Sequence, residues 1–490
     1  MTTQKALQDV QKGHPARPQG KEAPEAYPLG YVEDASEPRT KLAAFFNILI
    51  ETMAHLLDMM ASLVDDRVGV VAQVEEVRKE AGAPDFVCFS AQTGNMRVVN
   101  PAQRHGVFWA TGVAADRERA MAKAIGEAVE RYCAANYCEE DLPGVDYEHA
   151  CFPCVRPEEF TLYSAEQYWQ PGFPYVPFAK KTPIRWVPAL DLRTGETKYV
   201  PAARVFLGYT CDKNLGEQAI APQISTGLAC HTHPSLAAVS AVCEVIERDA
   251  VAITWQAKLT RPRIRLSTLS PQNRDLVERL KRPEASVKLL YLAMDHGVPV
   301  IFSVMTGTVP EAPALVVGAA AHLDPEQAVR RSLEELAQIW SFALRVKSTR
   351  PAFSPGAHWE QVVDSETHAA VYYDGAHARL AEFLYSSSEE MAFGEIKNLS
   401  TDNPSRDLRF LVEKIHGVNH RVLLADVTTE DMRGLGLFVV RAVIPGFHPL
   451  FMGHTYRALG GTRLWEIPQK LGYSGITRKQ GDNPFPHPFP

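Results

Sequence analysis

Two segments of the sequence carry the same arrangement of acidic and basic residues, Glu-x-x-Glu-Arg. One is Glu127–Arg131 and the other is Glu244–Arg248, and each follows an alanine-rich run. Residues three apart share one face of a helix, so each segment presents two carboxylates side by side. The flanking residues are apolar or small, which indicates that these faces are partly buried. Partly buried carboxylates that repel each other need cations.

Arg131 and Arg248 could neutralise one carboxylate on each helix, but four carboxylates meeting at one place would still carry excess negative charge. Ligand sets made only of oxygen favour magnesium, which usually takes phosphate oxygens in addition to protein atoms. The repeated motif therefore predicts a magnesium site that receives a nucleotide. The alternative is that each motif is an ordinary salt-bridged helix face, and the repetition weighs against it.

A third helical segment places Arg331, Glu335 and Gln338 at positions i, i+4 and i+7, which form one polar stripe. The guanidinium of Arg331 could bind a phosphate, and Glu335 could add a metal ligand. Arg/Glu pairs at this spacing are also common on exposed helices, so the stripe alone does not decide between the two readings.

The chain ends in Asn483-Pro-Phe-Pro-His-Pro-Phe-Pro490, with four prolines in the last seven residues. Alternating prolines favour a polyproline II rod, which is stiff without being helical or paired in a sheet. Such a rod could carry the terminal carboxylate of Pro490 into a cleft. The alternative, which composition alone favours, is a tail that docks on another protein.

Four of the eight cysteines lie close enough in sequence to suggest a zinc site, namely Cys133, Cys138, Cys151 and Cys154. The alternative is that Cys133 is a small buried helix residue and the others occupy a loop. The cysteines are too few and too scattered for a disulfide scaffold, and a reducing cytoplasm fits them best.

The pattern of apolar residues predicts the elements that position these groups, with helical spacing for the helices and short β-rich runs for the strands. The predicted helices are 40–64, 117–137, 234–257, 325–347 and 374–397. The predicted strands are 67–74, 185–192, 198–207, 287–294, 298–305, 314–319, 421–427 and 436–443. Gly-containing turns are expected at Thr111–Ala114 and Ser225–Ala229. Strands and helices mix without strict alternation, which indicates an α+β architecture.

Composition bounds the protein's class. With 51 Lys+Arg against 58 Asp+Glu, a net charge of −7 and 46% hydrophobic residues, the chain can bury a large core. It shows no basic footprint for nucleic acid and no apolar run long enough to span a membrane. We expect a disordered segment over 1–39, an amphipathic helix over 40–65, and one composite catalytic domain over 66–490. The helix is a candidate docking or dimerisation element, and the alternative, which the pattern favours, is a simple core helix.

Taken together, the motifs resemble those of the YcaO family, and more closely those of its azoline-forming cyclodehydratases. The resemblance runs from about Asp66 to Pro490 and is carried by both Glu-x-x-Glu-Arg segments, Ser225–Ala229, the Arg331–Gln338 stripe and the proline-rich ending. It implies a composite fold of mixed sheets and helices, with an internal pseudo-repeat around an ATP site.

The resemblance also implies roles for individual residues. It assigns magnesium to Glu127, Glu130, Glu244, Glu247 and Glu335, and it assigns ATP to these five together with Ser225, Arg331 and Gln338. The terminal carboxylate of Pro490 is the implied general base. Trp109–Gly112 departs from the family's usual Ser-Gly-Lys-Gly, so one expected lysine contact to ATP is missing or supplied elsewhere.

The implied reaction is an ATP- and magnesium-dependent cyclodehydration of Cys, Ser or Thr in a ribosomal precursor peptide to thiazoline or oxazoline. The alternatives are thioamide or amidine formation, against which the proline-rich ending argues, and a non-catalytic scaffold that binds ATP. Because we find no leader-binding module in this sequence, we expect a separate partner related to ubiquitin-activating enzymes or ThiF. A dehydrogenase in the same complex and a homodimer are further expectations.

Overall fold

The computed structural model describes residues 59–60, 62–101, 103, 105–160, 162–349 and 352–489. The chain divides into two units, Met1–Val64 and Asp65–Pro490, and the fold below is that of the second. The segment 1–39 lies outside the described residues, and so does nearly all of the predicted helix 40–64. The expectations of disorder and docking there stay predictions.

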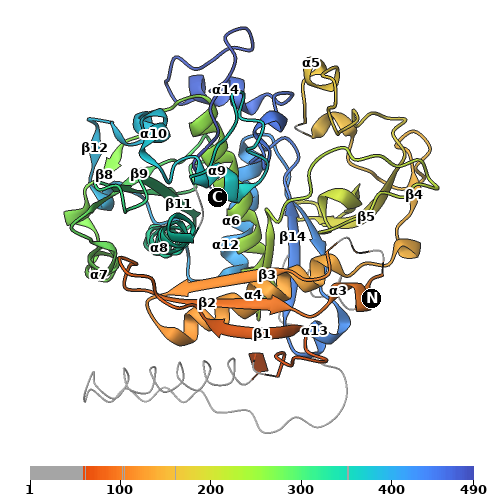
Figure 1. Ribbon diagram of the computed structural model, residues 1–490. Helices are drawn as coiled ribbons and strands as arrows, with labels where there is room; N and C mark the ends of the chain where they lie inside the picture. The colour runs from red at the N-terminus through yellow and green to blue at the C-terminus, as the bar shows by residue number, and fades with distance from the viewer. Residues whose placement is uncertain are drawn as a thin grey trace, which may run out of the picture. The chain divides into compact units, whose positions relative to one another are not determined.

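Three antiparallel strands form the first sheet, in the order β1-β2-β3. They are β1 (Val71–Glu76), β2 (Val87–Thr93) and β3 (Trp109–Ala114). Helix α4 (Arg117–Ala135) packs against this sheet (Figure 1). Gly112 permits the close approach, because a Cβ atom at this position would lie 2.1 Å from the carbonyl oxygen of Ala120.

A second sheet has five strands in the order β11-β10-β9-β8-β12. Its strands are β8 (Arg263–Ile264), β9 (Ala285–Tyr291), β10 (Val300–Gly307), β11 (Leu315–Ala321) and β12 (Glu390–Met391). All neighbours are antiparallel except β8 and β12. Every residue of β11 is buried, because α8 (Pro325–Thr349) and α6 (Pro234–Gln256) both pack against this strand.

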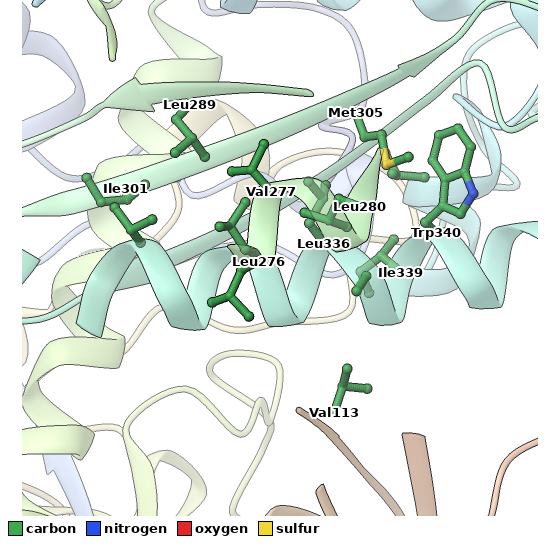
Figure 2. Packing of buried hydrophobic residues seen from close by; sticks show 14 of the residues in the cluster. Val113, Leu276, Val277, Leu280, Leu289, Ile301, Met305, Leu336, Ile339 and Trp340 are labelled. Atoms are coloured by element: carbon green, nitrogen blue, oxygen red, sulfur yellow. The ribbon is translucent and has the colours of Figure 1, made fainter. Parts of the chain in front are cut away.

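The apolar side of α8 explains how this helix is held in place. Leu336 and Trp340 are fully buried, and they belong to one cluster with Leu289 and Met305 from the sheet. Figure 2 shows α8 lying along the strands with these side chains between them and α7 (Pro271–Leu280) contributing from the side. Burial of each large side chain contributes about 1.5–3 kcal/mol, so the opposite, polar side of α8 is fixed with it.

The third sheet has the order β4-β5-β13-β14-β7, with β6 paired to β5. Its strands are β4 (Gly144–Val145), β5 (Ile184–Asp191), β6 (Thr197–Pro201), β7 (Leu228–His231), β13 (Leu423–Asp426) and β14 (Phe438–Val443). Helix α6 packs on β7 and β14 and runs through the centre of Figure 1.

The three long helices begin in similar ways, each two or three residues after a strand. The pairs are β3 with α4, β7 with α6, and β11 with α8. Asp116, His233 and Asp324 precede the helices, and each side chain accepts a hydrogen bond from a backbone N–H of the first turn. Such caps satisfy donors that the helix leaves unpaired. The fold therefore contains three strand–helix units.

The remaining helices are α3 (Met96–Val99), α5 (Ala165–Tyr168), α9 (Ser365–Ala370), α10 (Gly375–Ala378), α11 (Glu382–Tyr385), α12 (Pro404–Gly417), α13 (Glu430–Gly434) and α14 (Arg463–Lys470). Helices α12 and α14 pack against α6. Within the described residues, no helix has both the length and the apolar character that crossing a membrane requires.

The mixed α+β architecture is confirmed, and each predicted strand overlaps an observed one. Two local predictions are wrong. The predicted helix 374–397 is broken into short turns, because Ser386, Ser387 and Ser388 end the last of them. Thr111–Ala114 is part of strand β3 and not a turn, since its small residues are paired with β2 on one side and pressed on α4 on the other.

Candidate active site

Three helices bring polar side chains to one cavity of about 570 Å³. Helix α4 contributes Glu127, Glu130 and Arg131, helix α6 contributes Glu244 and Arg248, and helix α8 contributes Glu335 and Gln338. Ser225, in the loop before β7, also lines it. The cavity thus collects six of the eight side chains that the sequence analysis assigned to ATP.

Glu247 and Arg331 are not among the residues that line this cavity. Glu247 lies directly behind the wall, since its carboxylate is 3.4 Å from Nε of Arg248. Arg331 lies near His231 and His322, and its charge helps burial to lower the pKa of each imidazole to about 4. The assignment of Arg331 to a phosphate therefore stays a prediction.

One cavity-lining glutamate of each helix, namely Glu127, Glu244 or Glu335, is tied to the segment at or just before the strand that precedes that helix. In each case one carboxylate oxygen accepts a hydrogen bond from a backbone N–H about 16 residues earlier. The three bonds are Thr111 N to Glu127 at 2.8 Å, Gly227 N to Glu244 at 3.1 Å, and Ala319 N to Glu335 at 2.7 Å. This shared geometry shows that the third helix is a member of the repeat.

The polar residue three positions later reaches the strand of the next unit. Cys230 N of β7 donates to Glu130 at 2.7 Å, and Ala321 N of β11 donates to Glu247 at 3.4 Å. Gln338 closes the circle, because its side-chain amide donates to the hydroxyl of Thr111 on β3. The three units are therefore cross-linked around the cavity, with Glu, Glu and Gln in equivalent places.

Arginines partly balance the carboxylates, as the sequence analysis proposed. Arg131 pairs with Glu127 at 2.5 Å. The guanidinium of Arg248 lies 3.7 Å from Glu244 and 3.4 Å from Glu247. In Glu127, Glu244 and Glu247, one carboxylate oxygen, Oε2, accepts the backbone hydrogen bond, and the other oxygen, Oε1, faces the arginine. Arg131 and Arg248 do not balance five carboxylates, and the charges of Arg441 and Lys123 offset only part of the remainder at Glu244 and Glu335.

Burial in this site raises the pKa of four carboxyl groups, and their mutual repulsion adds to the rise. Burial raises the pKa of Glu130 well above its usual value, and the charges of Glu127 and Glu244 add to the rise. Burial, with Glu335 and Glu244 nearby, raises the pKa of Glu247 to about 8. Burial likewise raises the pKa of both Glu244 and Glu335. Ionising all of these groups together requires added positive charge.

The carboxylates of this site fit magnesium that is bound together with phosphate groups. All candidate ligands are carboxylate oxygens, which magnesium prefers. Among the residues that the structure describes, no three His, Cys, Asp or Glu side chains are close enough to hold a metal ion by themselves. Magnesium seldom uses an all-protein cage and is held by one or two carboxylates together with substrate phosphates. The arrangement therefore fits magnesium bound with a nucleotide.

The neighbouring residues Glu334 and Glu335 have different surroundings. Glu334 is buried and receives Arg119 at 3.0 Å, Lys123 at 3.2 Å and Arg330 at 3.5 Å. These contacts join α4 to α8. Glu335 points to the cavity instead. The sequence analysis singled out Glu335 and missed Glu334, whose role depends on residues more than 200 positions away.

The proline-rich tail is held along its whole described length. Trp255 donates to the carbonyl of Phe485, and Tyr372 donates to that of Pro486. The imidazole of His487 stacks on that of His368 with 3.8 Å between the ring centroids. These contacts draw the tail into the centre of the unit, where the end of the chain is marked in Figure 1.

The buried ring of Phe489 lies 4.5 Å from the guanidinium carbon of Arg248. The residue before the chain end therefore touches an arginine that lines the cavity. Pro490 itself lies outside the described residues, so its carboxylate stays a predicted base.

The cysteines show no zinc site within the described residues. Cys133 is buried in α4 with its sulfur 3.4 Å from the hydroxyl of Thr429, and Cys138 donates to Glu140. No disulfide joins any two of the eight cysteines, all of which lie within the described residues.

A cavity that gathers carboxylates from three strand–helix units defines a class of ATP- and Mg²⁺-dependent proteins. The family described as YcaO cyclodehydratase, ATP- and Mg²⁺-binding, matches residues 111–448, more than half of the chain. This chain belongs to the YcaO family, and its cofactors are ATP and Mg²⁺.

Two curated relatives are similar in sequence. An uncharacterized protein of Methanothermobacter thermautotrophicus is 30% identical over 341 residues, which are 68% of this chain and 80% of that protein. An uncharacterized protein from the tfuA 3′ region of Rhizobium leguminosarum bv. trifolii is 28% identical over 262 residues, 51% of this chain and 58% of that one.

Solved structures share the fold at lower identity. A heterocyclase in complex with substrate and cofactor has a TM-score of 0.73 at 22% identity and covers 89% of this chain. The heterocyclase TruD has a TM-score of 0.61 at 23% identity and covers 76%. This chain spans 57% and 51% of those two proteins. YcaO from Methanopyrus kandleri, bound with AMPPCP and Mg²⁺, has a TM-score of 0.58 at 22% identity and covers 81% of this chain and 91% of that protein.

Proposed function

We propose that this protein is an ATP-dependent cyclodehydratase that converts Cys, Ser or Thr residues of a ribosomal peptide to thiazolines or oxazolines. The observation that carries the proposal is the cavity lined by carboxylates from three helices, three of which, together with Glu247 behind the wall, have raised pKa values. Such a site attracts magnesium and with it the phosphates of ATP. The proline-rich tail beside Arg248 supports the azoline-forming branch.

In the proposed reaction, the substrate side chain attacks the carbonyl carbon of the preceding peptide bond. ATP, when bound, supplies a phosphoryl group for the resulting oxyanion, so that oxygen can leave as phosphate. The amide nitrogen then loses its proton and forms a C=N bond as the C–O bond breaks. The ring has lost the elements of one water molecule, and ADP and phosphate are released.

We assign complementary tasks to the protein groups. Glu127, Glu130, Glu244, Glu247 and Glu335 hold the magnesium ions that offset charge on the transferring phosphoryl group. Ser225, Arg331 and Gln338 bind the nucleotide. The carboxylate of Pro490 accepts a proton from the attacking side chain or the amide nitrogen, and the rigid tail keeps it in place.

A separate protein that captures the precursor's leader is part of this proposal. Two other similar structures are Escherichia coli microcin synthetase McbBCD complexes, one of them with pro-MccB17 bound. They cover 78% and 86% of this chain at 14% and 15% identity. We place the activity in the cytoplasm, which suits eight cysteines that form no disulfide with one another. A homodimer and an accompanying dehydrogenase are further parts of the proposal.

The test is mass spectrometry of a precursor peptide incubated with this protein, its partner, ATP and Mg²⁺. The neighbouring genes would identify both peptide and partner. Loss of one water per modified residue, dependent on ATP and Mg²⁺, is the expected result. Exchange of an amide oxygen for sulfur or for an added amine would overturn the azoline assignment in favour of an external nucleophile. Binding of a non-hydrolysable ATP analogue without any peptide modification would favour a scaffold.

A further inference from the structure

A small chamber, called here the arginine chamber, lies beside the nucleotide cavity. Its volume is about 50 Å³, and it shares Ile224, Thr226 and Arg248 with the cavity wall. Arg204 and Arg441 also line the chamber. Arg204 ends a short 3-10 turn after β6, and Arg441 lies on β14. Neither residue belongs to a motif that the proposed function uses.

The guanidinium of Arg441 is buried and incompletely bonded. The residue is only 4% exposed, and one of its nitrogens donates to the carbonyl of Ile224 at 2.7 Å. Its Nε and Nη1 have no hydrogen-bond partner in the part of the chain that the structure describes, and the same holds for Nε of Arg204. A buried charged donor without a partner is costly. Buried charges are normally paired, so these donors call for an acceptor.

The charges around the chamber point to an anion as that acceptor. Arg248 already lies close to both Glu244 and Glu247, whereas neither Arg204 nor Arg441 forms a salt bridge with a described carboxylate. Burial, together with the charge of Arg204, lowers the pKa of Arg441 to about 9, although the charge of the nearby Glu244 acts in the opposite direction. Arg441 is therefore still protonated at neutral pH, and two like charges remain close together in a buried space.

We propose that the arginine chamber binds a phosphate oxyanion. This inference rests on the proposed function for the ion's origin: when the C–O bond of the phosphorylated adduct breaks, its electron pair leaves with the phosphate oxygen, next to Arg248. The chamber has room for a few water-sized atoms, which suits a tetrahedral oxyanion. Guanidinium forks match phosphate oxygens in geometry and charge.

Two sources of this chemistry must be distinguished, free phosphate and the terminal phosphoryl group of the nucleotide. The probe is inorganic phosphate, titrated calorimetrically into the full-length protein at constant ionic strength. Saturable binding is expected for the wild type. Arg441→Met and Arg204→Met should each weaken it about tenfold or more, because each removes a charge-assisted contact. Arg265→Met, which removes an exposed arginine that directly follows β8 and does not line the chamber, should leave it unchanged.

A repeat of the titration with a saturating non-hydrolysable ATP analogue and Mg²⁺ identifies the source. Unchanged phosphate affinity assigns the chamber to free phosphate, and competition assigns it to the terminal phosphoryl group. Thermal unfolding checks the folding of each variant. Equal phosphate binding by the wild type and both chamber variants would overturn the proposal. Because the assay needs no peptide, a failure of cyclodehydration would leave this result standing, and the reverse also holds.

Discussion

The carboxylate cavity and the arginine chamber share a wall but differ in how their buried charges are satisfied. Each of the five glutamates accepts a backbone N–H, so its position is fixed before any ligand arrives. Arg441 instead keeps two donors without partners. The carboxylate cavity therefore has excess negative charge on oxygens held in place by the backbone. The arginine chamber has excess positive charge on N–H donors that lack an acceptor. The pair suits a reaction in which a magnesium-bound phosphoryl group leaves as a phosphate ion.

The largest expected effect is in the carboxylate cavity. Glu130→Gln or Glu247→Gln should reduce ATP-dependent peptide processing on the order of a hundredfold or more, because each removes one charge from the metal site at constant volume. The measurement is the rate of water loss from the precursor by mass spectrometry.

Glu118→Gln is the matched control, since Glu118 is exposed on the same helix as Glu130. Wild-type rates in both site variants would remove the magnesium assignment.

The second expected effect concerns the proline-rich tail, whose Phe489 contacts Arg248 in the wall shared by the two regions. A few residues added after Pro490 should slow ring formation about ten- to a hundredfold. A polyproline II rod rises about 3.1 Å per residue, while proton transfer needs heavy atoms within about 2.6–3.2 Å, so even one residue displaces the carboxylate too far. The same tag at the N-terminus is the control. If both tagged proteins dehydrate the peptide equally fast, the carboxylate is not the base.

A smaller effect separates two adjacent glutamates of α8. Glu334→Gln should lower the free energy of unfolding by about 1–2 kcal/mol, less than for a fully buried pair because Arg119 and Lys123 are partly exposed. Glu335→Gln should leave stability intact and weaken binding of a non-hydrolysable ATP analogue with Mg²⁺. Urea denaturation and calorimetry measure the two effects. Equal losses of stability in both variants would contradict the assignment of Glu335 to the metal site.

The contrast between the regions also explains what the sequence could predict. Glu127, Glu130, Glu244 and Glu247 stood out because a repeated spacing places them on helix faces, and that signal is local. The sequence showed the polar stripe of α8 but not that it is a third copy of the motif, because Gln338 takes the place of the second glutamate. The hydrogen bond from Gln338 to Thr111 is seen only in the structure. The pattern Glu-x-x-Glu/Gln in three helices could have revealed it.

Arg204 and Arg441 gave no such signal. They lie on unrelated elements, and only the packing of β14 beside α6 brings them to one chamber. The same holds for Glu334, whose cations come from another helix. Elements with small residues, such as β3, were also missed, because alternation of apolar and polar residues is weak there. Helix α12 was also missing from the predicted helices, although its Asn403-Pro404 start is a helix signal that can be read from the sequence.

The last prediction is a pH dependence without magnesium. Because the pKa of Glu247 is about 8 in the folded protein and near 4.5 when unfolded, the folded state holds more protons between these values. The contribution of Glu247 to stability should therefore fall as pH rises from about 5 to about 8 and then level off. Saturating Mg²⁺ with a non-hydrolysable ATP analogue should remove most of this decline, since the added cations favour the ionised carboxylates. Thermal unfolding of the wild type and of Glu247→Gln in a metal chelator across this range measures the effect as a difference, because buried histidines with lowered pKa values, such as His231 and His322, change stability in the opposite direction below about pH 6.5. A difference that does not change with pH would show that the arginines alone balance the carboxylates, and the contrast between the two regions would then be smaller than we infer.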